Sequence, residues 1–302
     1  MDRDYFNQNK RSTLVWFRKM PVDRRLTVKI NQMDSFLKSG RFLLALPMLI
    51  FPILHFIYPS FVASIIPPWI PWHFFWTYFT ALTILAAGIA IVIGKYEYVA
   101  ALLLGTEIFL FVALIHVFLL FHKAGDAWAE RPMFGEYPSR VINAFKDFGL
   151  FGAVFIFAGT KSQSWRNTRK DNSLVFGRTI VGISITAFGL LQFVYPGHGP
   201  GIPPMLNTVV FVFPGREFWA YTTGAALVIA GIFLVIGKET RNLTAYLGVL
   251  LLVFDLLVWV PQFFVNPADL YGNWLKDLGI IGGVLILAES LPKKPRTVLD
   301  VD

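Results

Sequence analysis

The chain has 302 residues, of which 55% are hydrophobic and only 15% charged, with a formal net charge of +8 and a mean hydropathy of +0.58. Soluble domains carry nearer one quarter charged residues, so this composition and its long apolar runs predict an integral membrane protein. There is no cysteine, which excludes disulfides, thiol catalysis, thiolate metal sites and c-type haem attachment.

The first 39 residues are polar and basic, and they contain no apolar core of a cleavable signal peptide. Leu26, Ile30, Met33 and Leu37 recur at helical spacing, which favours a helix lying on the anionic cytoplasmic surface. A leader without regular structure that only sets the orientation of the chain is the alternative.

Eight apolar segments follow, and most reach the roughly 17–25 residues that cross a bilayer. The fourth is short, and we expect it to begin within the interface. With the N-terminus inside, cytoplasmic segments hold 21 of the 27 lysines and arginines, so both termini are expected in the cytoplasm. No nucleic-acid partner is expected, because these basic residues flank the spans. The predicted spans are 41–58, 74–93, 97–121, 145–159, 178–195, 217–236, 243–260 and 275–291.

The second half of the chain repeats the first in the same order. Four crossings per unit is an even number, so the two units are expected to be parallel repeats in an all-α membrane fold. The expected division is a leader (1–39), a first four-helix repeat (40–160), a cytoplasmic linker (161–176), a second repeat (177–291) and a tail (292–302). The matching segments are Gly40-Arg41 with Gly177-Arg178, His55-Phe56-Ile57-Tyr58-Pro59 with Gln192-Phe193-Val194-Tyr195-Pro196, Phe75-Trp76-Thr77-Tyr78 with Phe218-Trp219-Ala220-Tyr221, Gly94-Lys95 with Gly237-Lys238, and Lys146-Asp147 with Lys276-Asp277.

Each half resembles the DoxX family of four-helix membrane proteins on these segments, which together cover most of residues 40–290. The halves depart from the family pattern at Pro52, where a glycine is expected before the histidine, and at Gln192, which replaces the histidine in the second half. The resemblance implies a bacterial plasma-membrane protein that is linked to a membrane redox complex, such as a quinone-reducing thiosulfate oxidoreductase. A quinone is the cofactor that it implies.

The repeated motif places an asparagine and an aspartate four residues apart, at the mouth of an apolar helix whose N-terminus is expected to face outward. In one interpretation Asp147 and Asp277 cap the first turn, while Lys146 and Lys276 extend to lipid headgroups. In the other, the asparagine–aspartate pairs line a cavity in the outer leaflet.

Two acidic residues, Glu107 and Asp255, lie in the middle of apolar spans. A carboxyl at the bilayer centre costs roughly 2.5–3.5 kcal/mol on insertion scales. Their repeat equivalents are Leu250 and Val112, so the repeated architecture does not require either acid. Each is interpreted either as facing a cavity or as a neutral acid that is hydrogen-bonded to another helix.

His55 and His116 lie at similar outer depth in the first and third spans and would form a metal or b-type haem pair if they faced each other. The second half has Gln192 and Trp259 there, which disfavours haem, and we predict no metal site. Hydrogen bonding near a quinone-like ring and a simple interfacial role remain open. The candidate cavity residues are His55, Tyr58, Glu107, His116, Asn143, Asp147, Gln192, Tyr195, Asp255, Asn273 and Asp277.

Three functional classes remain open. The preferred one is a subunit or accessory of a membrane redox complex that binds a quinone-like lipophile near the outer leaflet, and any enzymatic role would be as a quinone-linked oxidoreductase subunit. The alternatives are a non-catalytic scaffold or lipid/cargo-binding protein, and a small-solute transporter. Few polar residues match at midplane in both halves, which weighs against transport.

Overall fold

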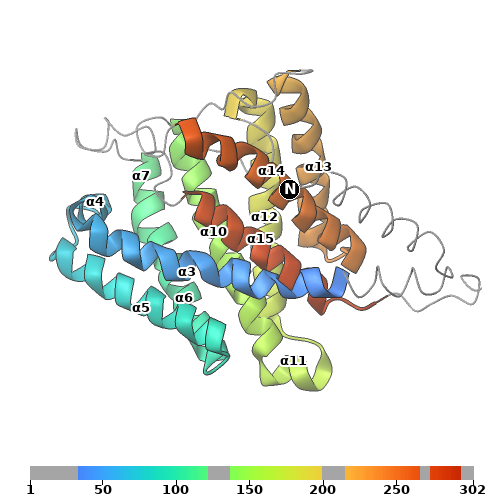
Figure 1. The fold of residues 1–302 in the computed structure, drawn as a ribbon, viewed down its shortest axis with the longest axis horizontal. Helices are drawn as coiled ribbons and strands as arrows, with labels where there is room; N and C mark the ends of the chain where they lie inside the picture. Colours follow the sequence, from blue (N-terminus) through green and yellow to red (C-terminus); the bar gives the residue numbers. More distant parts are fainter. Residues whose placement is uncertain (1–32, 122–136, 199–214, 266–272, 294–302) are drawn as a thin grey trace, which may run out of the picture.

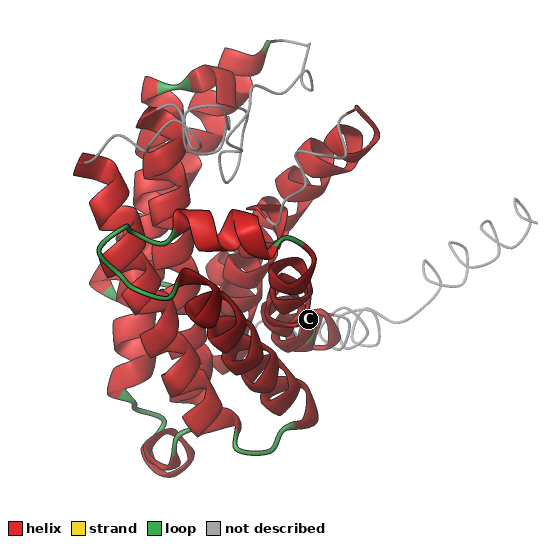
Figure 2. Ribbon diagram, turned by 90° about the vertical axis from the view of Figure 1, so that its left-hand side faces the viewer, coloured by secondary structure: helices red, strands yellow, loops and turns green. Residues whose placement is uncertain are grey.

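A computed structural model describes residues 33–121, 137–198, 215–265 and 273–293, and all regular structure in these ranges is helical (Figures 1 and 2). Seven of the described helices are long and apolar enough to cross a membrane. The first half contains α3 (Gly40–Ile57), α4 (Pro59–Ile65), α5 (His73–Ile93), α6 (Glu97–Phe111), a π turn η1 (Val112–His116), α7 (Val117–Phe121) and α10 (Tyr137–Lys161). The remainder contains α11 (Gln163–Thr168), α12 (Asn172–Val194), the 3-10 turn η2 (Pro196–His198), α13 (Arg216–Ile236), α14 (Arg241–Val265) and α15 (Asn273–Ser290).

Each predicted apolar segment coincides with one of these helices, but the prediction of a short fourth span was wrong. That helix, α10, has 25 residues and begins at Tyr137 rather than near residue 145. The polar residues Asn143, Lys146 and Asp147 therefore lie inside the helix, where partners on other helices accommodate them. The last helix, α15, has 18 residues and includes Lys276, Asp277 and Glu289, and it is not one of these seven.

The helices form two sets that cross, as Figure 1 shows: α3, α5 and α15 run across the view, whereas α10, α12 and α13 run up it. Within these sets α3 packs against α5 and α15, and α12 packs against α13 and α10. The helices α10 and α15 also contact each other where the sets meet. The last helix of each half thus packs on the first helix of the other half.

Glycines make these packings close, as small residues commonly do between membrane helices. A Cβ atom added to Gly282 of α15 would lie 2.6 Å from the carbonyl oxygen of Gly40, which starts α3. A Cβ atom added to Gly152 of α10 would lie 2.8 Å from the carbonyl oxygen of Gly177 in α12. The two contacts join matching positions, and neither leaves room for a side chain.

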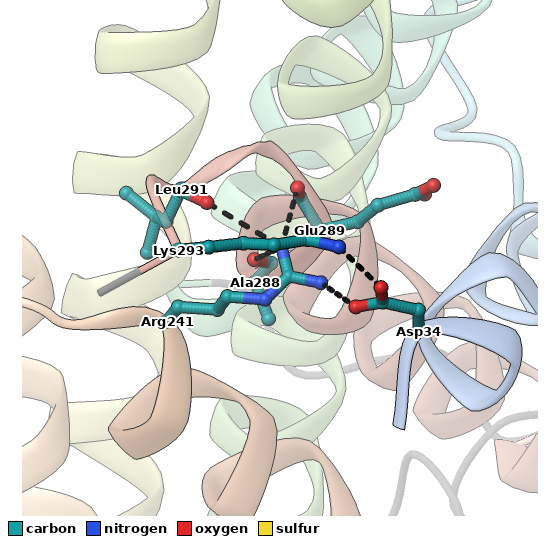
Figure 3. Close-up of polar contacts among 6 residues, drawn as sticks. All are labelled: Asp34, Arg241, Ala288, Glu289, Leu291 and Lys293. Carbon is teal, nitrogen blue, oxygen red and sulfur yellow. Dashed lines mark hydrogen bonds and ion pairs between the residues drawn. The ribbon is translucent and has the colours of Figure 1, made fainter. Parts of the chain in front are cut away.

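The N-terminal and C-terminal parts of the described chain meet around Arg241 at the start of α14 (Figure 3). Its guanidinium donates to the carbonyl oxygen of Glu289 at 2.8 Å, near the end of α15, and to Asp34 at 2.6 Å. Lys293 forms an ion pair with the same Asp34 carboxylate. Leu37, one turn further on, is fully buried, so residues 33–39 pack onto the helices rather than standing apart.

Candidate functional site

A cavity of about 950 Å³ lies in the first half, between α3, α4, α5, α6 and α10. Its lining extends from Ile70 and Trp76, near the start of α5, to Ala87 and Ala100, near the end of α5 and the start of α6. Aliphatic and aromatic side chains make up most of the wall. We call the end of the helices that carries α4 and the start of α5 the α4 end.

Six of the predicted candidates line this cavity, and Lys276 of α15 joins them. The six are His55, Tyr58, Glu107, His116, Asn143 and Asp147. They come from α3, α6, η1 and α10 and from the loop after α3, so the fold brings together residues that are more than ninety positions apart in sequence.

The polar residues at one part of the cavity form a connected network. The Nε2 atom of His116 contacts the Oδ2 atom of Asp147, and Lys276 donates to the other carboxylate oxygen at 2.7 Å. Lys276 also donates to Asn143 Oδ1 at 2.8 Å. The prediction that Asp147 caps a first turn and that Lys276 reaches headgroups was therefore wrong: Asp147 is the eleventh residue of α10, and Lys276 crosses to the other half to neutralise it.

A second network repeats this pattern with the halves exchanged. Lys146 donates to Asp277 Oδ2 at 2.8 Å, and both side chains are fully buried. The indole N–H of Trp259 donates to the same oxygen at 3.1 Å, and the Asp255 carboxyl interacts with that of Asp277. Lys146 is therefore not an interfacial anchor either. Trp259 takes the position in α14 that His116 takes in the first half.

The π turn η1 explains how His116 and Glu107 both line the cavity. Nine residues separate them, and on a regular α-helix about nine steps of ~100° would place them on opposite faces. A π turn contains about one residue more than an α turn, so it rotates the residues after it back by roughly 100°. The sequence offers no pattern that reveals such a turn.

Glu107 occupies a second polar position, at mid-length of the cavity. Its Oε1 atom accepts a hydrogen bond from the Thr83 hydroxyl at 2.8 Å. Thr77 and Thr80 line the cavity on the two preceding turns of α5, and their hydroxyls donate to the carbonyl oxygens of His73 and Trp76. Glu107 therefore lies on the cavity wall and is hydrogen-bonded to another helix, α5.

The remaining candidates do not line this cavity. Gln192 accepts a hydrogen bond from Thr223 at 2.5 Å inside the second half. Tyr195, Asp255 and Asp277 likewise belong to the second half, and Asp277 is held by Lys146. The side chain of Asn273 lies outside the described residues.

The two cavity histidines are each engaged through one ring nitrogen. His55 Nδ1 lies 2.7 Å from the carbonyl oxygen of Phe51, and His116 Nε2 contacts Asp147. Among the described residues, the other nitrogen of each ring has no hydrogen-bond partner and remains for a ligand. Within the described ranges, no three His, Cys, Asp or Glu residues are placed to hold a metal ion.

Chemically, the cavity combines an apolar wall with two polar positions, which suits a lipophilic molecule that carries hydrogen-bonding groups. Lysine and asparagine offer donors, and the histidines offer either a donor or an acceptor. Comparison of the chain with protein-family models, with curated proteins and with solved structures finds no match.

Proposed function

We propose that this chain is a membrane protein that binds a quinone-like lipophile in the first-half cavity and serves as a subunit or accessory of a membrane redox complex. The observation that carries the proposal is the cavity itself: about 950 Å³ of largely apolar space whose lining includes Lys276, Asn143 and His116. Ligand pockets are typically ~300–1,000 Å³, mostly apolar, with a few placed polar groups.

A quinone ring presents carbonyl oxygens, which need hydrogen-bond donors. Lys276 has three N–H donors and uses two of them on Asp147 and Asn143. The amide NH₂ of Asn143 and the free ring nitrogen of His116 add further groups at the same level. The long apolar wall formed by α5 and α6 suits an isoprenoid tail.

The second half supports the site rather than duplicating it. The buried indole of Trp259 stands where the first half has His116, and Gln192 is held by Thr223 where the first half has His55. These two substitutions remove the imidazoles on which the first-half cavity depends. We infer a single binding half and a structural half.

We further propose that α15 is an eighth span and that the two halves are parallel DoxX-like repeats with cytoplasmic termini in a bacterial plasma membrane. The reciprocal Lys146–Asp277 and Lys276–Asp147 ion pairs support this, because they exchange matching residues between the halves. The matching glycine contacts of α3 with α15 and of α12 with α10 support it in the same way. The asymmetry of lysine and arginine supports the orientation.

The test is the lipophile content of the protein as purified. We expect extracted protein to carry a quinone-like molecule, and His55→Ala to lower the amount bound per folded protein. Gln192→Ala is the matched control, because it truncates the equivalent position in the second half, outside the first-half cavity. Equal lipophile content in both variants, or a protein that carries only phospholipid, would contradict the proposal.

A further inference from the structure

Glu107 is an acidic residue of the cavity wall that the proposed lipophile site does not use. It lies about half-way along the cavity wall, and its carboxyl accepts a hydrogen bond from the Thr83 hydroxyl rather than from a basic side chain. Among the residues that the structure describes, no lysine, arginine or histidine forms an ion pair with it. A carboxyl in a membrane span without a cation is costly, and such acids mark proton or ion pathways.

A stripe of hydroxyls connects Glu107 with the α4 end of the cavity. Thr77, Thr80 and Thr83 follow one another at three-residue intervals along α5, and all three line the cavity together with Glu107. Each hydroxyl donates a hydrogen bond to a backbone carbonyl oxygen or to Glu107. Its oxygen can still accept hydrogen bonds. Water molecules in the cavity would find an acceptor on each turn of the helix.

The second half provides an internal comparison. The positions that match Thr77 and Thr83 are Ala220 and Ala226, and the position that matches Glu107 is Leu250. The carboxyl and two of the three hydroxyls are therefore absent together from the second half. This joint occurrence indicates that the hydroxyl stripe serves the carboxyl rather than the helix packing.

We propose that Glu107, with Thr77, Thr80 and Thr83, forms a proton-binding site that exchanges protons through the cavity with the membrane side at the α4 end. In this exchange a hydronium ion gives its proton to the Glu107 carboxylate and leaves water, and release reverses the step. The hydroxyl stripe positions the water molecules that carry the proton. The site does not depend on the identity of the bound lipophile.

Dicyclohexylcarbodiimide tests this, because it modifies protonated carboxyl groups in apolar surroundings. The full chain is reconstituted in liposomes with the pH set separately on each side, and its orientation is read from a cysteine introduced at Ser164. We expect an adduct on Glu107, located by mass spectrometry, that decreases several-fold as the pH is raised on the α4 side. Glu107→Gln should lack that adduct. The proposal would be overturned if the amount of adduct depended only on the pH of the side opposite the α4 end, or on the pH of neither side. Absence of any adduct on Glu107 would overturn it as well.

A second arm tests the hydroxyl stripe. Thr77→Val combined with Thr80→Val should slow the response of labelling to a pH jump on the α4 side several-fold. Thr179→Val is the control, because its hydroxyl donates to a backbone carbonyl of α12 outside the cavity. If labelling responded to the pH jump at the same rate in the double variant and in the control, the proposed role of the hydroxyl stripe would be contradicted. These experiments measure carbodiimide adducts and not bound lipophile. A negative result would therefore contradict the proton-binding proposal and leave the lipophile proposal to its own test.

Discussion

Lys146 and Asp277 form an ion pair of 2.8 Å with both side chains fully removed from solvent, across 131 positions of the chain. Lys276 and Asp147 form the reciprocal pair at 2.7 Å. Each lysine is adjacent in sequence to the aspartate that it does not bind. The two pairs therefore tie α10 to α15 in a way that neither half could achieve alone.

Lys146→Met should destabilise the protein strongly, because it leaves the buried Asp277 carboxylate without a cation. Breaking a buried pair by removing one partner costs about 3–5 kcal/mol. The double variant Lys146→Met/Asp277→Leu should recover most of that loss, since apolar replacement of a whole pair is often nearly neutral. The measurement is the free energy of unfolding in detergent. A single variant as stable as the wild type would show that the pair does not hold the halves together.

His116→Trp should preserve the fold but empty the cavity. The second half already has this arrangement, with the Trp259 indole donating to Asp277 at 3.1 Å. An indole N–H that donates to Asp147 replaces one hydrogen bond by another, so the unfolding free energy should change by no more than about 1 kcal/mol. The larger ring would occupy the ligand's place. Bound lipophile, measured after extraction, should fall; unchanged content would place the ligand elsewhere.

The helices of this fold were predictable from the sequence, because long apolar segments indicate membrane helices directly. The partners of Lys146 and Lys276 were not predictable. Each lysine precedes an aspartate at a helix mouth, which favours an interfacial interpretation, and only the crossing of α10 and α15 reveals the exchange. The π turn η1 also has no sequence signature, although it decides that His116 shares a cavity with Glu107.

Gly282→Ala and Gly152→Ala should destabilise the protein by similar amounts. At Gly282 a methyl group would lie 2.5 Å from the backbone nitrogen of Leu44, and at Gly152 it would lie 2.8 Å from the carbonyl oxygen of Gly177. Backbone atoms cannot move aside, so a loss of about 1–3 kcal/mol is expected, as for other overpacked sites. Thermal unfolding of both variants checks this. A large effect in one variant and none in the other would contradict matching packing of the two halves.

Arg241→Ala should loosen the join between the two ends of the described chain (Figure 3). The guanidinium supports Asp34 and carbonyl oxygens near the end of α15, and hydrogen bonds of charged groups contribute about 1.5–3 kcal/mol. Amide hydrogen exchange of residues 33–39 should therefore accelerate. Asp34→Asn should have a smaller effect on α15, because Arg241 still holds its carbonyls. Unchanged exchange in Arg241→Ala would rule out this role.

The proposed parallel repeats make a topological prediction that the cysteine-free chain is well suited to test. Single cysteines at Lys95, Ser164 and Lys238 should react with an impermeant maleimide from one side of the membrane. Cysteines at Ser60 and Glu217 should react from the opposite side, because α5 and α13 separate them from the first set. Reaction of Lys95→Cys and Lys238→Cys from different sides would exclude two parallel units.

A density map of the protein as isolated from its membrane tests the central claim most directly. We predict elongated density in the cavity between α5, α6 and α10, with a polar group within hydrogen-bond distance of Lys276 or Asn143. Fragmentation of the extracted ligand should identify a quinone-like ring. A cavity that holds only water, or acyl chains with no polar contact to Lys276, Asn143 or His116, would contradict the account.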